Sequence, residues 1–189
     1  MEALLINSAD SNSEFRELES NDFDLIMQKH QKRIFRLLLS MVRDLETAEH
    51  LTQECFLRAF KNRSSFRGGS QISTWLIRIA INLANDHNRN KQFAFWRSMH
   101  RVDHIESFAL PDAGRSPEQR LIDREKLDQL QAAIDRLPRK QKTAFLLRFV
   151  EEMPLEEISE AMDLEIGTVK SHLFRASESV KKFYRKKKL

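Results

Sequence analysis

A stretch near the end of the chain, LEIGTVKSHLFRA at residues 164–176, gathers side chains that can donate hydrogen bonds and carry positive charge. Val169 and Leu173 are four residues apart, so they share one face of a helix and leave the polar residues to the opposite face. The hydroxyls, cations and imidazole of that polar face belong to Thr168, Lys170, Ser171, His172 and Arg175. The pattern indicates a helix whose polar face needs a partner.

The residues just before this stretch predict a shorter helix, LEEISEAM, followed by a turn at Asp163. The apolar residues with the spacing of two crossing helices are Ile158, Ala161, Leu164, Val169 and Leu173. A short helix, a tight turn and a longer cationic helix form a helix-turn-helix, whose second helix enters the major groove of DNA. A plain helical hairpin with a solvated cationic face has the same spacing, so the pattern leaves both interpretations open.

A second set of polar side chains follows a loop with one aromatic residue. The loop, NRSSFRGGSQIST, is rich in Ser and Gly and holds Phe66, and Ser73 is the predicted N-cap of the next helix. The predicted apolar face of that helix is Trp75, Leu76, Ile79, Ala80 and Leu83. Its polar face is Arg78, Asn82, Asp86 and Arg89. The chain thus places an aromatic loop beside a polar helix face.

The helix before that loop, ETAEHLTQECFLRAF, is acidic at its front and basic at its back, which suits the helix dipole. The residues that recur every three or four positions and face a core are Ala48, Leu51, Cys55 and Ala59. The outer face is left with Glu46, Glu49, Gln53 and Glu54. This helix therefore presents an acidic surface.

The rest of the chain predicts further helices in two small domains. Four Gly and four Pro in 189 residues, with many strong helix formers, make the predicted fold class all-α. A first helix is predicted from about Asp22 to Arg43, and periodicity fades between Asn90 and Ser116, which indicates a linker. The predicted segments are an acidic stretch at 1–20, a domain at 21–92, a linker at 93–116 and a second domain at 117–189.

The second domain begins with a strong helix-start signal. Ser116 is the predicted N-cap, Pro117 the first helical residue, and Gln119 lies three residues after the cap. The residues through which this helix is expected to pack are Leu127, Leu130, Ile134 and Leu137. Pro138 ends it and opens the next helix, and Pro154 separates that one from the helix-turn-helix.

Charge is distributed unevenly along the chain, although its net value is only +4. Residues 2–24 hold seven carboxylates and one arginine, whereas residues 58–101 hold nine cations and one aspartate. Residues 164–189 hold eight cations and two glutamates. Two separate basic zones suggest a polyanion that is bound at two places, although a basic tail is more often simply solvated. The acidic N-terminus could mask the basic surfaces, which is a hypothesis from this contrast alone.

Several other classes of protein fit the sequence poorly. Cys55 is the only cysteine, which excludes an internal disulfide and a structural cysteine–zinc cluster. We find no secretory leader and no apolar run long enough to span a bilayer, so we expect a soluble, cytoplasmic protein without membrane insertion. His100 and His104 flank Asp103 but lack an evident third ligand, so a surface pair explains them better than a metal site. With no catalytic or phosphate-loop motif, we expect neither an enzyme nor a cofactor.

Two stretches resemble a known family. LPRKQKTAFLLRFVEEMPLEEISEAMDLEIGTVKSHLFRAS resembles region four of bacterial sigma factors, and ETAEHLTQECFLRAF with SSFRGGSQISTWLIRIAINLANDH resembles region two. Their order and spacing are similar to the extracytoplasmic-function (ECF) group of the sigma-70 family, over about Asp22 to Val180. The chain departs from the family pattern at Asp163, where Gly is usual, at Glu165, where Pro is usual, and at His172, where Arg or Lys is common. Asp tolerates a left-handed turn, so we expect the turn to survive.

The resemblance implies a role for each polar surface. The residues expected to bind core RNA polymerase are Glu46, Glu49, Gln53, Glu54 and Leu57, although each one alone is better explained as a solvated residue. The residues expected to bind and open the minus-ten element are Phe66, Ser70, Arg78, Asn82, Asp86 and Arg89. The residues expected at the minus-thirty-five element are Thr168, Lys170, Ser171, His172, Phe174 and Arg175. Among these, we expect Arg175 to contact a guanine edge and Thr168 and His172 to contact phosphates.

The sequence therefore predicts a sigma factor that binds core RNA polymerase and promoter DNA and directs promoter-specific initiation. The resemblance also implies control by an anti-sigma factor. One alternative is a stand-alone helix-turn-helix regulator, which would leave the acidic helix and the Phe66 loop unexplained. Another is a helical interaction protein whose basic faces are merely solvated.

Overall fold

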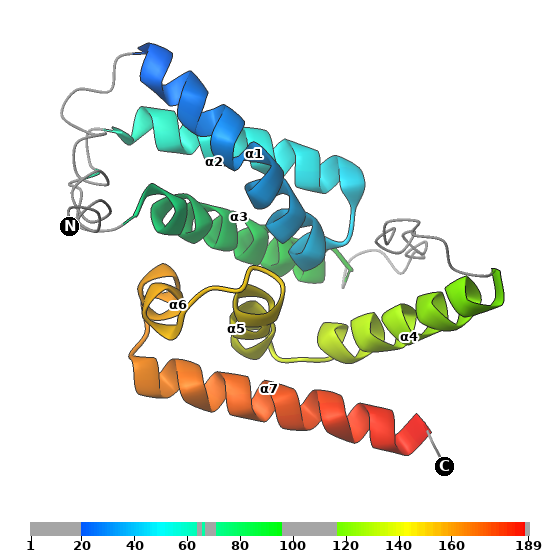
Figure 1. The fold of residues 1–189 in the computed structure, drawn as a ribbon. Helices are drawn as coiled ribbons and strands as arrows, with labels where there is room; N and C mark the ends of the chain where they lie inside the picture. The colour runs from blue at the N-terminus through cyan, green and yellow to red at the C-terminus, as the bar shows by residue number, and fades with distance from the viewer. Residues whose placement is uncertain (1–19, 64–65, 67–70, 96–116, 188–189) are drawn as a thin grey trace, which may run out of the picture. The chain divides into compact units, whose positions relative to one another are not determined.

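The computed structural model contains α-helices as the regular elements of its described residues, so the predicted all-α fold is confirmed (Figure 1). The described residues are 20–63, 66, 71–95 and 117–187, with side chains described at 23–63, 66, 71–89 and 125–183. The chain divides into two compact units, Met1–Asn88 and Arg89–Leu189. The helices are α1 (Ser20–Val42), α2 (Leu45–Lys61), α3 (Ile72–Phe95), α4 (Pro117–Asp135), α5 (Arg139–Phe149), α6 (Leu155–Met162) and α7 (Ile166–Lys187).

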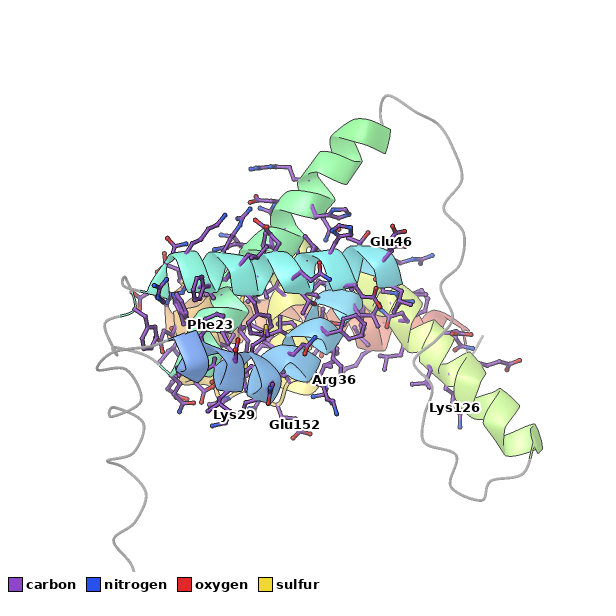
Figure 2. The ribbon with its side chains drawn as sticks, turned by 90° about the horizontal axis from the view of Figure 1, so that it is seen from above. Phe23, Lys29, Arg36, Glu46, Lys126 and Glu152 are labelled. Carbon is purple, nitrogen blue, oxygen red and sulfur yellow. The ribbon has the colours of Figure 1, made fainter. Side chains whose placement is uncertain are left out.

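Helices α1 and α2 form an antiparallel pair joined by a two-residue turn. Arg43 has a positive φ of 60°, which ends α1 and reverses the chain. The Asp44 carboxylate then accepts a hydrogen bond of 2.7 Å from the Thr47 N–H and caps α2. At the other end of the pair, the Phe23 ring meets the rings of Phe56 and Phe60 at centroid distances of 6.5 and 5.2 Å. Figure 2 shows Phe23 at the start of α1, far along the pair from Glu46 at the start of α2.

The third helix is tied to both members of that pair. The Cys55 thiol donates to the Leu76 carbonyl at 3.6 Å, and the Asn88 amide donates to the Met41 carbonyl at 3.5 Å. Burial raises the pKa of the Cys55 thiol to about 12, although the Arg58 charge opposes the shift. This cysteine is therefore a protonated, apolar-type core residue rather than a reactive nucleophile.

Helix α3 differs from its prediction at both ends. It begins at Ile72, so Ser73 lies inside the helix and donates to the Gln71 side chain at 3.4 Å instead of capping the N-terminus. It continues to Phe95, so the fading periodicity after Asn90 did not mark its end. Loss of an amphipathic pattern does not stop a helix whose residues keep good helix propensity. The remainder of the predicted linker, residues 96–116, lies outside the described residues.

In the second unit α7 packs against α4, α5 and α6 (Figure 1). The α4–α7 contact buries Ala133, Leu137, Ala176 and Val180, and Phe145 of α5 packs against the same cluster. Polar contacts at its margin include an ion pair of 2.8 Å between Lys142 and Asp135. Pro117, Pro138 and Pro154 lie at helix starts, as their fixed backbone angle favours.

The turn of the helix-turn-helix has the form expected from the sequence. Asp163 adopts a left-handed conformation, with φ 52° and ψ 55°, directly after α6. The Asp163 N–H donates to the Glu160 carbonyl, and the Leu164 N–H donates to the Ser159 carbonyl at 3.0 Å. These two bonds make a Schellman motif, which normally takes glycine at the left-handed position. The turn therefore forms although the chain carries Asp there.

The described helices include none that is long and apolar enough to cross a membrane. Within the same residues, no group of three His, Cys, Asp or Glu side chains is placed to hold a metal ion. His100, Asp103 and His104 lie outside the described residues.

Candidate nucleic-acid and protein interfaces

The outer face of α2 presents the acidic surface expected from the sequence. Glu46, Glu49 and Gln53 are exposed, and Leu57 is an apolar spot with 53% of its surface accessible. Glu54 differs from the other carboxylates, because it forms an ion pair of 2.7 Å with Arg58 one turn later. The charge available to a partner is therefore concentrated near the start of α2, where Figure 2 shows Glu46.

The polar stripe of α3 also forms as expected. Asn82, Asp86 and Arg89 are exposed and Arg78 is half-buried, at spacings of three or four residues that keep them on one face. Phe66 is half-buried and lies against the start of this face, because its ring packs on Trp75 with 5.2 Å between centroids and 57° between planes. Ser70 lies outside the described residues. An aromatic pair thus precedes a row of polar side chains.

Trp75 lies elsewhere than the sequence predicts. It is half-buried, whereas the buried apolar residues of α3 are Leu76, Ile77, Ala80, Ile81, Leu83 and Ala84. At about 100° per residue, Trp75 falls on the same side of the helix as Arg78 and Asn82. The sequence prediction placed Trp75 on the apolar face with Ile79 and Leu83, because these three positions are four residues apart. Successive four-residue steps move around the helix, so the three residues do not share one face. Trp75 therefore belongs with Phe66 and the polar face.

The polar face of α7 is the most cationic of the three surfaces. Thr168, Lys170, Ser171 and Arg175 are exposed, and Phe174 has 70% of its surface accessible. The Ser171 hydroxyl donates to the Gly167 carbonyl at 3.0 Å, which leaves its oxygen able to accept a hydrogen bond. Val169 and Ala176 are fully buried on the opposite side. Because Val169 and Ala176 pack into the core, the polar face of α7 points to solvent.

His172 differs in environment from its neighbours on α7. Its ring is half-buried, and Nδ1 is enclosed without a hydrogen-bond partner among the described residues. Burial lowers the pKa of His172 below its ordinary value, and the Lys140 and Arg175 charges lower that pKa further. Both effects therefore favour the neutral form of the imidazole.

Lys140 is a cation that sequence reasoning did not connect with the polar face of α7. It is exposed in the first turn of α5 and acts electrostatically on His172 of α7, thirty-two positions further along the chain. The available signal was PRKQ, a helix start with two cations in its first turn and no acid. That arrangement opposes the helix dipole and is a feature of anion-binding helix starts.

Comparison with known proteins shows the family of this chain. Residues 26–94 match the family Sigma-70 region 2, and residues 127–180 match Sigma-70, region 4. The RNA polymerase sigma-H factor of Pseudomonas aeruginosa is 35% identical over 164 residues, which cover 85% of this chain and 84% of that protein. The chain belongs to the sigma-70 family. Its relatives include the ECF sigma factor SigW of Bacillus subtilis, 31% identical over 87% of this chain and 89% of that protein, so it is a sigma factor of the ECF group.

Two solved structures share the fold. The sigma factor RpoE, solved with the anti-sigma factor NepR from Bartonella quintana, has a TM-score of 0.68 and 21% identity, over 87% of this chain and 98% of that one. CnrH, solved with the cytosolic domain of CnrY, has a TM-score of 0.65 and 15% identity, over 88% of this chain and 90% of that one. Sigma factors bind core RNA polymerase and promoter DNA, so the predicted function and both of these partners are confirmed. The stand-alone regulator is thereby set aside.

Proposed function

We propose that three helix faces of this sigma factor have three different binding roles. The acidic face of α2 docks on core RNA polymerase, the Phe66 loop and the polar face of α3 open the minus-ten element, and α7 reads the minus-thirty-five element. The observation that carries the proposal is that three exposed faces on three helices differ in charge and chemistry. Glu49 represents the first face, Asn82 the second and Arg175 the third, and all are exposed.

The minus-ten step depends on the aromatic pair. A base that leaves the duplex needs a stacking wall and polar groups for its edge. Phe66 and Trp75 offer the wall, and Asn82 lies seven residues beyond Trp75 on the same helix face. Arg78, Asp86 and Arg89 extend that face along the strand, and Ser70 remains a candidate from the sequence. Binding energy from the captured strand then drives opening, and the chain itself performs no catalytic chemistry.

The upstream element is read by α7. Arg175 has the planar donor pair that matches a guanine edge, Lys170 and Ser171 lie beside it, and Phe174 is exposed enough to meet a thymine methyl. Thr168 and His172 contact phosphates. The proposed domains are 21–92 for region two and 117–189 for region four. The segment 93–116 joins them, and its first three residues are the end of α3.

Regulation and location follow from the same proposal. The solved structure of the sigma factor RpoE contains the bound anti-sigma factor NepR, so we expect an anti-sigma factor to control this chain as well. Because core polymerase and the promoter are cytoplasmic in bacteria, the sigma factor acts in the cytoplasm.

Run-off transcription with purified core polymerase tests the proposal. Genomic fragments selected by binding to the reconstituted holoenzyme serve as templates, with core alone and the sigma factor alone as the two controls. We expect discrete starts only when both proteins are present. If core-dependent transcription starts persist when Asn82 and Arg175 are replaced by Ala, the DNA-binding roles assigned to α3 and α7 are contradicted. Tight DNA binding without any core-dependent start would contradict the proposed activity.

A further inference from the structure

Arg63 follows the end of α2 and comes three residues before Phe66, and its side-chain contacts belong to none of the three assigned faces. Its Nη1 atom donates a hydrogen bond of 2.9 Å to the Phe60 carbonyl, and its guanidinium lies 4.3 Å from the centroid of the Phe60 ring. Its own carbonyl accepts a hydrogen bond of 3.2 Å from the Phe66 N–H. The side chain of this exposed arginine therefore returns to α2, while its backbone holds Phe66.

The end of α2 gives Arg63 a fixed base. Phe60 packs edge-on against Phe23 of α1, with 5.2 Å between ring centroids. Asn62 returns to the same helix end, because its backbone N–H and its side-chain amide both donate to the Arg58 carbonyl, at 3.0 and 2.8 Å. The last carbonyls of a helix lack partners within the helix, and a cation beside them is favoured by the dipole. Arg63 therefore completes a helix end that its neighbours already fix.

Phe66 is held from two sides. Its N–H is bound to the Arg63 carbonyl three residues earlier, which is the hydrogen bond of a tight turn. Its ring packs on Trp75 of α3 with 5.2 Å between centroids. The turn thus connects the position of the Arg63 side chain on α2 with the position of the Phe66 ring on α3.

We propose that Arg63 is a positioning residue, whose guanidinium closes the end of α2 and thereby fixes the turn that presents the Phe66 ring to Trp75. The inference rests on the proposed function for the role of this aromatic pair as a wall for minus-ten bases. It assigns no DNA contact to Arg63, although this residue belongs to the first basic zone of the sequence.

A direct phosphate contact is the alternative role for an exposed arginine in a basic zone. Such a contact depends on positive charge, so lysine would replace Arg63. The positioning role depends on a planar group that stacks on Phe60 and donates a hydrogen bond at the same time, which the compact ammonium of lysine does not provide. A phosphate contact would also act independently of Phe66, whereas a positioning residue acts through it. These two differences separate the roles experimentally.

The first experiment measures the aromatic contact in the free chain. The protein has two tryptophans, so Trp96→Phe leaves Trp75 as the only source of tryptophan fluorescence. In this background we expect Phe66→Ala and Arg63→Ala to shift the emission to longer wavelength and to raise quenching by acrylamide, because both expose the Trp75 ring to water. Arg63→Ala should cause no further shift in the Phe66→Ala protein. A Trp75 emission that Arg63→Ala leaves unchanged would contradict the proposal.

The matched control is Lys61→Ala, which removes the same charge two residues earlier, at an exposed position in the last turn of α2. It should leave the Trp75 emission unchanged. Arg63→Lys keeps the charge and should recover only part of the emission shift. Circular dichroism and thermal unfolding check that each variant keeps its helices. Equal shifts for Lys61→Ala and Arg63→Ala would show that charge at the helix end moves the ring, and the assigned role of Arg63 would be wrong.

The second experiment measures how the reconstituted holoenzyme binds a single-stranded oligonucleotide that carries the nontemplate minus-ten sequence of a selected promoter. We expect Arg63→Ala to weaken this binding about fivefold, which is part of the loss expected when a base is no longer stacked. Arg63→Lys should weaken it as well, and binding to the upstream duplex should stay the same. The slope of log affinity against log salt should also stay unchanged, whereas loss of a phosphate contact would lower it by about 0.7.

Additivity decides between the two roles. In the Phe66→Ala holoenzyme, Arg63→Ala should weaken strand binding by less than about twofold, because the ring that it positions is absent. A loss as large as in the wild-type background, or an Arg63→Lys protein that binds the strand like wild type, would show a charge contact and overturn the proposal. If the fluorescence results are as expected but strand binding is insensitive to both Phe66→Ala and Arg63→Ala, the proposed minus-ten role fails and the positioning of the ring stands.

Discussion

Arg175 is the residue on which sequence selectivity of this sigma factor is expected to depend most. Its guanidinium is exposed on α7, while Val169 and Ala176 anchor the opposite face in the core. Arginine pairs with a guanine edge through two parallel hydrogen bonds, whereas Lys170 offers a compact charge without that geometry. The two cations should therefore affect DNA binding in different ways.

We predict that Arg175→Ala weakens holoenzyme binding to the selected upstream duplex by about 1 to 3 kcal/mol, because a bidentate base contact is lost. Binding to a scrambled duplex should weaken far less. Lys181→Ala is the matched control, since Lys181 is exposed on the same helix and already pairs with Glu178 at 3.0 Å. Competition binding with the two duplexes gives both affinities, and an equal loss on each would contradict the base-reading role.

At the scale of elements, the helix-turn-helix depends on how α6 ends. The Schellman bonds of Asp163 and Leu164 satisfy carbonyls of α6 and direct the chain into α7. The Ser159 hydroxyl adds a hydrogen bond to the Leu164 carbonyl, and the Glu165 carbonyl accepts the first bonds of α7 from Thr168 and Val169. The orientation of the recognition helix is thus set by a turn in which one residue has an unfavourable backbone conformation.

We predict that Asp163→Gly makes α6 and α7 more stable than Asp163→Ala does, by about 1 kcal/mol. Both variants remove the carboxylate from the negative end of α6, but only glycine adopts φ 52° without a steric cost. Native-state hydrogen exchange of amides in α6 and α7 measures the difference. Equal protection in the two variants would show that the left-handed residue stores no strain.

At the scale of the whole molecule, the two compact units carry different tasks. The acidic face of α2 lies in the first unit, and the cationic face of α7 lies in the second. Charge complementarity at an interface determines the choice of partner and the association rate more than the raw affinity. The two faces carry opposite charge, so each suits a different partner. Polymerase binding and upstream DNA binding should therefore be separable by mutation.

We predict that Glu49→Lys combined with Gln53→Lys weakens binding to core polymerase by at least about tenfold, because like charges then oppose a basic partner. Binding of the chain alone to upstream duplex DNA should remain unchanged. Both positions are exposed and avoid Glu46, whose carboxylate favours the start of α2. Glu125→Lys with Asp128→Asn on α4 is the matched control, because it changes the net charge by the same amount at two exposed positions. Equal effects of the two pairs on polymerase affinity would contradict the α2 assignment.

The sequence by itself determined the all-α fold, the helix-turn-helix and the three polar faces, because each depends on spacing within one helix. Local physics also accounted for the left-handed Asp163 and for the helix starts at Pro117 and Pro138. Periodicity was misleading at Trp75, where four-residue steps suggested the core, and after Asn90, where α3 continues. The first error arose because successive four-residue steps drift around the helix. The second arose because loss of an amphipathic pattern does not end a helix whose residues keep good helix propensity.

Only the tertiary structure brought together residues that are distant in the chain. The contact of Phe66 with Trp75 depends on where the Phe66 ring lies against α3, and the effect of Lys140 on His172 depends on the packing of α5 against α7. The buried, protonated thiol of Cys55 likewise depends on the approach of α3 to α2. Helical periodicity describes one helix at a time, whereas burial and charge interactions depend on which helices meet.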